Sequence, residues 1–277
     1  MAALSKTTAY SARVADSDGW VDYSQTEDQT WAHLFSHQKK LICQRACKEF
    51  LQGLEILNLP TDRVAQVPEV NRALFAATQW QLQPVAAVIP FAEFFELLSQ
   101  RKFPAATFIR RPEDIEYLQE PDIFHEIYGH CPMLTNPVFA DFVQAYGKLG
   151  LAATPKERVY LARLFWFSVE FGLINTHEGL RTYGAGILSS TSECCYALEN
   201  YAVERRPWGV MNVLRTPYRI DIMQPIYYVI DSYEQLYAAM DSAVMRQIHT
   251  AMQIGLFPPT YTPPKNSTVA IPVKHDC

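Results

Sequence analysis

The sequence predicts a mainly α-helical fold with short β segments, formed as a single domain. Three observations predict it. Apolar residues recur at helical spacing over long stretches, the strand-like runs are short, and no internal repeat or low-complexity linker divides the 277 residues. Hydrophobic residues make up 49% of the chain and charged residues 19%, so the chain can bury a sizeable core.

The elements are expected in the following order. Apolar positions over 30–57 predict one long amphipathic helix, and the apolar run 84–90 lies between two prolines, which favours an extended segment. Further expected elements are a helix at 91–100, a strand or loop at 105–109, an irregular charged stretch at 111–119, a helix from Pro121 that ends near His130, and helices at 136–149, 155–171, 189–203 and 232–252. Residues 1–26 form a polar N-terminal segment, 27–257 the domain, and 258–277 a proline-rich tail.

Composition excludes several classes of function. The formal net charge is -5 and the basic residues are scattered, so the sequence predicts no basic patch that would bind nucleic acid or an anionic membrane. The N-terminus lacks the apolar stretch of a signal peptide, and no run is long enough to span a membrane. Six dispersed cysteines fit reduced thiols, so we expect a cytoplasmic protein that acts on a small molecule.

Two histidines and one acid form the candidate metal site. His125 and His130 are five residues apart, and Glu170 lies alone in an apolar run. Five residues on an ideal helix separate side chains by about 140°, so chelation by both histidines requires the helix to end or distort, for which Gly129 offers a point. Two imidazoles and one carboxylate suit a mononuclear Fe(II) centre that keeps open positions.

Two other interpretations of these residues stay open on spacing alone. The zinc-protease pattern places its histidines four apart, so His125 and His130 miss it by one residue. Glu170 could instead form a buried salt bridge with Arg163, because an unpaired carboxylate in an apolar helix is costly.

Taken with its flanks, this constellation resembles the pterin-dependent aromatic amino acid hydroxylases. The matching segments are 121–132 (PDIFHEIYGHCP), 165–173 (FWFSVEFGL), 183–190 (YGAGILSS), 224–229 (QPIYYV) and the pair Thr30-Trp31. The resemblance implies that 27–257 is a catalytic iron/pterin domain with the mainly helical fold of that family. It also implies that His125, His130 and Glu170 are catalytic residues and bind Fe(II).

The resemblance assigns the substrate to four positions. Arg110 is expected to hold the substrate carboxylate, since a guanidinium can pair with a carboxylate through two parallel hydrogen bonds. Ser189 would assist through its hydroxyl, and Trp166 would form a wall of the aromatic pocket. Val229 is apolar where the tyrosine-hydroxylating branch tends to carry an acid.

The resemblance also implies a tetrahydropterin cofactor such as tetrahydrobiopterin. Phe94 aligns with the aromatic residue that stacks on the pterin ring, and Ile89 and Glu126 are expected near the cofactor.

The implied activity is a monooxygenase that hydroxylates phenylalanine with O2 in phenylalanine catabolism, as the short bacterial phenylalanine 4-hydroxylases do. A pterin carbinolamine dehydratase is the implied functional partner, and the chain is expected to be a monomer or a dimer. The alternatives are a hydroxylase of tyrosine or tryptophan, a zinc hydrolase, and a non-catalytic protein that binds an amino acid.

Overall fold

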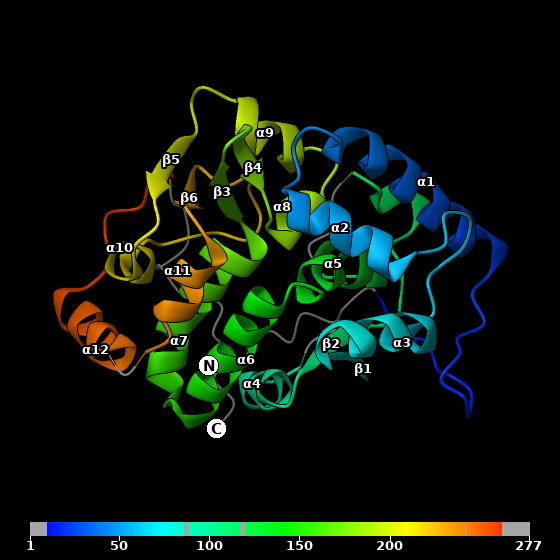
Figure 1. Ribbon diagram of the computed structural model, residues 1–277, viewed down its shortest axis with the longest axis horizontal. Helices are drawn as coiled ribbons and strands as arrows, with labels where there is room; N and C mark the ends of the chain where they lie inside the picture. Colours follow the sequence, from blue (N-terminus) through cyan, green and yellow to red (C-terminus); the bar gives the residue numbers. More distant parts are fainter. Residues whose placement is uncertain (1–9, 86–88, 117–119, 242, 262–277) are drawn as a thin grey trace, which may run out of the picture.

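The computed structural model describes residues 10–85, 89–116, 120–241 and 243–261, and several of its helices pack against α6 (Pro137–Ala152) (Figure 1). Helices α4 (Phe91–Ser99) and α11 (Tyr233–Ala238) pack on α6, as does the short α5 (Cys131–Leu134). Two glycines permit the α4 contact. A Cβ at Gly147 would lie 2.5 Å from the backbone nitrogen of Ser99, and one at Gly150 would lie 2.0 Å from the ring of Phe95.

The other helices pack on one another and on these elements. They are α1 (Gln25–Ile42), α2 (Lys48–Leu57), α3 (Val67–Thr78), α7 (Pro155–Phe165), α8 (Ala185–Leu188), α9 (Glu193–Glu199), α10 (Val210–Arg215) and α12 (Val244–Ile254), with a short 3₁₀ turn, η1 (Pro112–Asp114). None of the helices in the described ranges combines the length and hydropathy needed to cross a bilayer.

Two small sheets complete the fold. Strands β1 (Gln81–Val85) and β2 (Lys102–Ala106) form a parallel pair. The larger sheet has the order β4-β3-β6-β5, in which β6 (Ile226–Ile230) pairs in parallel with both β3 (Gly172–Thr176) and β5 (Glu204–Pro207), and β4 (Gly179–Thr182) runs antiparallel to β3. The predicted fold class, mainly helical with short strands in a single domain, is therefore confirmed.

Two segments have π-helical turns. The first, η2 (His125–His130), lies between a short helical start and α5, and the second, η3 (Trp166–Glu170), extends α7. The predicted helix that ends near His130 is wrong in this respect, because the helix continues through α5 to Leu134.

Several predicted boundaries also differ. The long helix expected at 30–57 is two helices, because Ala46 bridges to Thr182 in β4 and the Cys47 side chain caps the start of α2 by accepting from the backbone N–H of Phe50. The helix expected at 232–252 is likewise divided into α11 and α12, and the one expected at 189–203 is the shorter α9. Parts of the runs expected at 84–90 and 111–119, and the tail from 262, lie outside the described residues.

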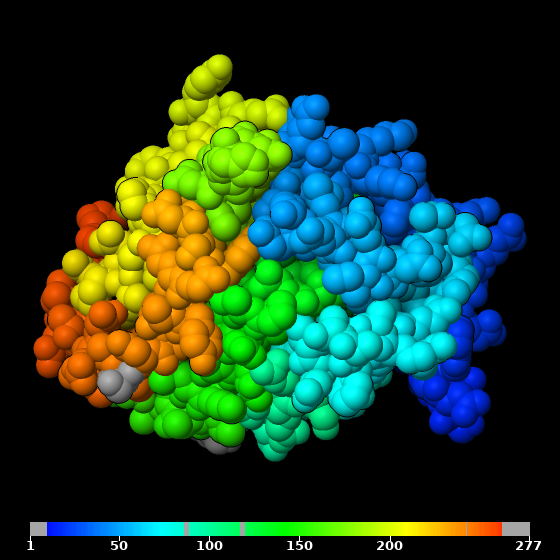
Figure 2. All heavy atoms as spheres, in the orientation of Figure 1, coloured from blue at the N-terminus to red at the C-terminus, as the bar shows by residue number. Residues whose placement is uncertain are grey.

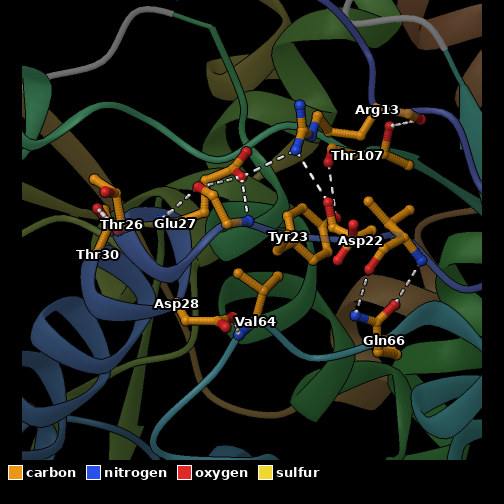
Figure 3. Close-up of polar contacts among 12 residues, drawn as sticks. Arg13, Asp22, Tyr23, Thr26, Glu27, Asp28, Thr30, Val64, Gln66 and Thr107 are labelled. Carbon is orange, nitrogen blue, oxygen red and sulfur yellow. Dashed lines mark hydrogen bonds and ion pairs between the residues drawn. The ribbon is translucent and has the colours of Figure 1, made fainter.

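The described part of the N-terminal segment packs against the body of the protein. Figure 2 shows it in dark blue at one edge of the molecule, where a Cβ at Gly19 would lie 3.2 Å from Pro68 at the start of α3. Figure 3 shows its polar contacts: the Thr107 hydroxyl donates to the carbonyl of Arg13 at 2.9 Å, and the Tyr23 hydroxyl donates to the carbonyl of Thr107 at 2.7 Å. These contacts fasten the segment to the stretch that follows β2.

Candidate metal centre

The three expected metal ligands meet in one place. The Nε2 atoms of His125 and His130 are 3.0 Å apart, and Glu170 oxygens lie 3.6 Å and 3.3 Å from them, respectively. Donor atoms of all three residues lie within 4.8 Å of one another. Ligands that share one metal at about 2 Å have separations of this size, so the geometry fits a single ion.

The π turns explain how residues with this spacing converge. A π turn forms hydrogen bonds between residues five apart, so its wider turn brings residue i+5 near residue i. In η2 this brings His130 over His125, and in η3 the N–H of Phe171 donates to the carbonyl of Trp166 at 2.8 Å. The distortion that the spacing required is therefore a widened turn instead of a helix end.

Ser189 determines which nitrogen of His125 carries the proton. The Ser189 hydroxyl donates to the carbonyl of Ala185 at 2.8 Å, so it accepts from Nδ1–H of His125, also at 2.8 Å. The lone pair of His125 is then on Nε2, which points at the candidate metal position. Burial lowers the pKa of His125 to about 4, so the imidazole is neutral, as a metal ligand must be.

Glu170 supplies the negative charge of the site. Burial by itself would raise its pKa, but the neighbouring His130 and His125 outweigh burial and lower it. Arg163, the alternative partner, instead donates to the carbonyl of Val159 at 2.9 Å and lies over the ring of Tyr160. A carboxylate with two imidazoles fits a divalent iron ion that keeps positions open on one side.

Arg110 is held by a carboxylate of the protein itself. Its Nε and Nη2 donate to the two oxygens of Asp122 at 2.8 Å and 2.9 Å, and its backbone N–H donates to Asp122 at 3.0 Å. Both side chains are buried. The Nε–Nη2 edge of the guanidinium is therefore occupied, so a substrate carboxylate could pair only with the Nη1–Nη2 edge, where Nη1 also donates to the carbonyl of Ile115 at 3.4 Å.

These groups open into one cavity of about 490 Å³. Nine of the ten expected site residues line it: Ile89, Phe94, Arg110, His125, Glu126, His130, Trp166, Glu170 and Ser189. Val229 does not; it lies on β6, paired with Leu173 and Pro207. Any influence of Val229 on substrate choice would have to pass through other residues.

The expected pterin side of the cavity is aromatic and acidic. The Phe94 ring lies edge-on to Phe165 at 5.2 Å, which leaves it half-buried at the cavity wall. Burial, with a smaller effect from Glu170, raises the pKa of Glu126 well above its ordinary value, which favours the neutral carboxyl that can donate a hydrogen bond.

Sequence reasoning missed several residues of this site. Phe103 lies 4.4 Å from the His130 ring, and Glu193 and the segment 220–223 line the cavity. Asp122 was part of a recognised motif but had no role. The signal for Asp122 was its place three residues before His125, whose backbone N–H it accepts at 3.0 Å.

Comparisons with known proteins point to one family. A model described as biopterin-dependent aromatic amino acid hydroxylase matches residues 3–262. A phenylalanine-4-hydroxylase of Vibrio cholerae is 53% identical over 92% of this chain and 89% of its own, and one of Pseudomonas aeruginosa is 50% identical over 95% and 99%.

Solved structures agree with the sequence comparisons. The apo phenylalanine hydroxylase of Colwellia psychrerythraea superposes with a TM-score of 0.88 at 50% identity, covering 90% of this chain and 97% of its own. A Chromobacterium violaceum phenylalanine hydroxylase with bound iron(III) and oxidised 7,8-dihydrobiopterin superposes with a TM-score of 0.80 at 45% identity, covering 86% and 89%.

Proposed function

The chain belongs to the biopterin-dependent aromatic amino acid hydroxylase family, and on that premise we propose that it is a phenylalanine 4-monooxygenase, which converts L-phenylalanine to L-tyrosine with O2 and a tetrahydropterin. Relatives at 46–53% identity are named phenylalanine-4-hydroxylase. The observation that carries the proposal is the convergence of His125, His130 and Glu170 on one point in a cavity large enough for an amino acid and a pterin.

The iron ligands of the proposal are these three residues. Ferrous iron and the reduced pterin together supply the activation of O2 that ring hydroxylation needs. Ser189 contributes by keeping the His125 proton on Nδ1, which leaves Nε2 free to bind the metal.

The substrate is held by Arg110 and Trp166. The Nη1–Nη2 edge of the Arg110 guanidinium, where Nη1 also donates to the carbonyl of Ile115 at 3.4 Å, receives the α-carboxylate. Asp122 holds the opposite edge and prevents the side chain from turning away. The Trp166 indole forms the wall beside the substrate ring. Rigid placement is the main contribution of the protein, because the reacting carbon must be held at attack distance from the metal.

The pterin would be held by residues that line the same cavity. Phe94 stacks on its ring, Ile89 adds apolar contact, and Glu126 donates or accepts a hydrogen bond at the edge of the ring system.

Three further points belong to the proposal. The product of pterin oxidation requires recycling, so a pterin carbinolamine dehydratase is the expected functional partner. A cytoplasmic location fits the five described cysteines, all of which are free thiols. The protein is expected to act as a monomer or a dimer.

The test is anaerobic reconstitution with Fe(II), followed by a panel of phenylalanine, tyrosine and tryptophan with tetrahydropterin and O2. The expected result is tyrosine formation from phenylalanine that requires iron, pterin and O2 together. Preferred turnover of tyrosine or tryptophan would change the substrate assignment. Hydrolysis of a substrate with zinc alone would overturn the oxygenase assignment, and binding of phenylalanine without any product would indicate a binding protein.

The metal ligands have their own test. Glu170→Ala should weaken iron binding by more than about 100-fold, since the loss of residues that only support a ligand already costs 10- to 100-fold. Iron content after gel filtration and the unfolding temperature are the measurements. Glu178→Ala is the matched control, because that carboxylate lies at the surface in the β3–β4 turn. Unchanged iron affinity in Glu170→Ala would contradict the ligand role.

A further inference from the structure

Gln224 is a buried amide that joins two walls of the cavity. It lies two residues before the start of β6 and is only 2% exposed. Its Nε2 donates to the carbonyls of Arg219 and Ile222, each at 2.9 Å, and its Oε1 accepts from the indole N–H of Trp166 at 3.1 Å. Trp166 and the segment 220–223 both line the cavity, so one side chain connects them.

The orientation of this amide follows from its partners. Both hydrogens of Nε2 point at carbonyl oxygens, which can only accept. A flipped amide would set its oxygen against those two carbonyls and its nitrogen against the Trp166 N–H, and all three contacts would become repulsive. The oxygen of Gln224 is therefore fixed toward the indole.

A second buried group holds the backbone of Gln224 in place. The Glu193 carboxylate accepts from the backbone N–H of Gln224 at 2.9 Å and from the hydroxyl of Tyr227. Because Gln224 is anchored at its backbone and bonded through its whole amide, it cannot move without breaking several buried hydrogen bonds. Each of these is costly to leave unmade.

The Trp166 indole is fixed on its faces as well as at its edge. Its ring stacks on Tyr218 with centroids 4.4 Å apart and an interplanar angle of 18°, and Phe171 lies at 4.5 Å. Stacking permits a ring to slide within its plane, whereas the directional bond to Gln224 does not. The hydrogen bond therefore determines how far the indole edge extends into the cavity.

We infer that Gln224 is a positioning residue that sets the width of the aromatic pocket between Trp166 and the segment 220–223, and thereby favours the single ring of phenylalanine over the indole of tryptophan. This inference rests on the proposed function. A pocket of fixed width rejects a larger ring by overlap, whereas a pocket whose wall can slide accommodates it.

The experiment compares substrate choice in four proteins: wild type, Gln224→Met, Trp166→Phe and the double variant. Methionine has about the length of glutamine but lacks its amide, and phenylalanine lacks the indole N–H. The quantity measured is the ratio of kcat/KM for phenylalanine to kcat/KM for tryptophan, with iron loaded and pterin saturating. Gln66→Met is the matched control, because Gln66 is a buried amide bonded to the backbone of Val21 and does not line the cavity.

Gln224→Met should lower the ratio by about three- to tenfold, which corresponds to one net hydrogen bond. In the Trp166→Phe background the same change should alter the ratio by less than about twofold, because the bond is already lost there. Gln66→Met should leave the ratio unchanged even if it lowers the unfolding temperature.

Three outcomes would overturn the inference. The ratio could stay at its wild-type value in folded Gln224→Met, it could fall equally in both backgrounds, or it could fall as much in Gln66→Met. If Gln224→Met does not fold, Gln224→Asn shortens the side chain by one methylene, withdraws its oxygen from the indole, and should lower the ratio in the same direction. A wild-type protein that hydroxylates none of the three amino acids would refute the proposed function instead, which separates the two failures.

Discussion

At the scale of single residues, Asp122 connects Arg110, the proposed substrate-binding residue, to His125, a candidate metal ligand. Its oxygens accept from Arg110 and from the backbone N–H of His125, and the side chain has no exposed surface. Burial alone would raise the pKa of Asp122, but the charge and hydrogen bonds of Arg110 outweigh burial and lower it. The carboxylate is therefore ionised in the folded protein at a pH where it would be protonated in the unfolded chain.

This pair predicts a pH dependence of stability. Because the folded pKa of Asp122 lies below its unfolded value of about 4, the pair stabilises the fold above that pH, and the contribution is lost as the pH falls through the folded pKa. Asp122→Asn should lower the free energy of unfolding at pH 7 by about 3 kcal/mol, since it leaves the Arg110 charge buried without its partner. Its stability should also fall less steeply below pH 4.

Urea unfolding between pH 7 and pH 3 measures both effects. Asp231→Asn provides the control. Asp231 is exposed and directly follows β6, and the hydrogen bond described for its carboxylate comes from the side-chain amide of Asn175. Equal losses in the two variants would show that the Arg110 pair is not the source of the effect.

Some contacts of the candidate site could be predicted from the sequence and others could not. The meeting of His125, His130 and Glu170 could be predicted, because the local motifs around them are specific. The occupied edge of Arg110 could not, because it depends on a tertiary contact with Asp122, twelve positions away. Gln224 had no visible role for the same reason: its partners, Trp166 and Glu193, come from other parts of the chain.

At the scale of elements, helices with strong local signals were predicted well. Helix α4 is confirmed at 91–99, and α6 begins where Asn136 caps it and Pro137 occupies its first turn. The division between α1 and α2 was missed because it is caused by β4: the backbone N–H of Cys47 donates to Thr182 at 2.9 Å, across 135 positions of sequence. Periodicity cannot report such a contact, and it also cannot distinguish an α turn from the π turns that bring the metal ligands together.

The α2–α5 crossing offers a test at this scale. A Cβ at Gly53 in α2 would lie 2.1 Å from the carbonyl oxygen of Pro132 in α5, two residues after His130. Because that neighbour is backbone, Gly53→Ala must separate the two helices, and we expect a loss of about 2 kcal/mol in the free energy of unfolding. Gly209→Ala is the control, since a Cβ there meets only the Asn212 side-chain nitrogen at 3.8 Å. Thermal unfolding of both variants is the measurement, and equal unfolding midpoints would contradict the predicted clash between α2 and α5.

At the scale of the whole molecule, the N-terminal segment packs against the stretch of chain that carries Arg110, the proposed substrate-binding residue. The Tyr10 ring stacks on Phe108 with centroids 4.6 Å apart. Its hydroxyl donates to Asp114 and accepts from the backbone N–H of Arg111 at 3.2 Å. Arg110 lies between Phe108 and Arg111, so Tyr10 contacts the chain on both sides of it. No pattern in the sequence predicts this contact, because a polar N-terminal segment has the same composition whether or not it packs.

We therefore expect Tyr10→Phe, which keeps the ring and removes the hydroxyl, to weaken phenylalanine binding more than pterin binding. The apparent dissociation constant of phenylalanine should rise by about three- to tenfold, the value of one or two net hydrogen bonds, while that of the pterin stays within about twofold. Tyr201→Phe is the control, because Tyr201 is fully exposed. Coupling is reciprocal, so saturating phenylalanine should also slow amide hydrogen exchange across residues 10–21 in the wild type, and this slowing should be reduced in Tyr10→Phe. Equal weakening of both ligands, or exchange that phenylalanine leaves unchanged, would mean that the segment only stabilises the fold and does not position Arg110.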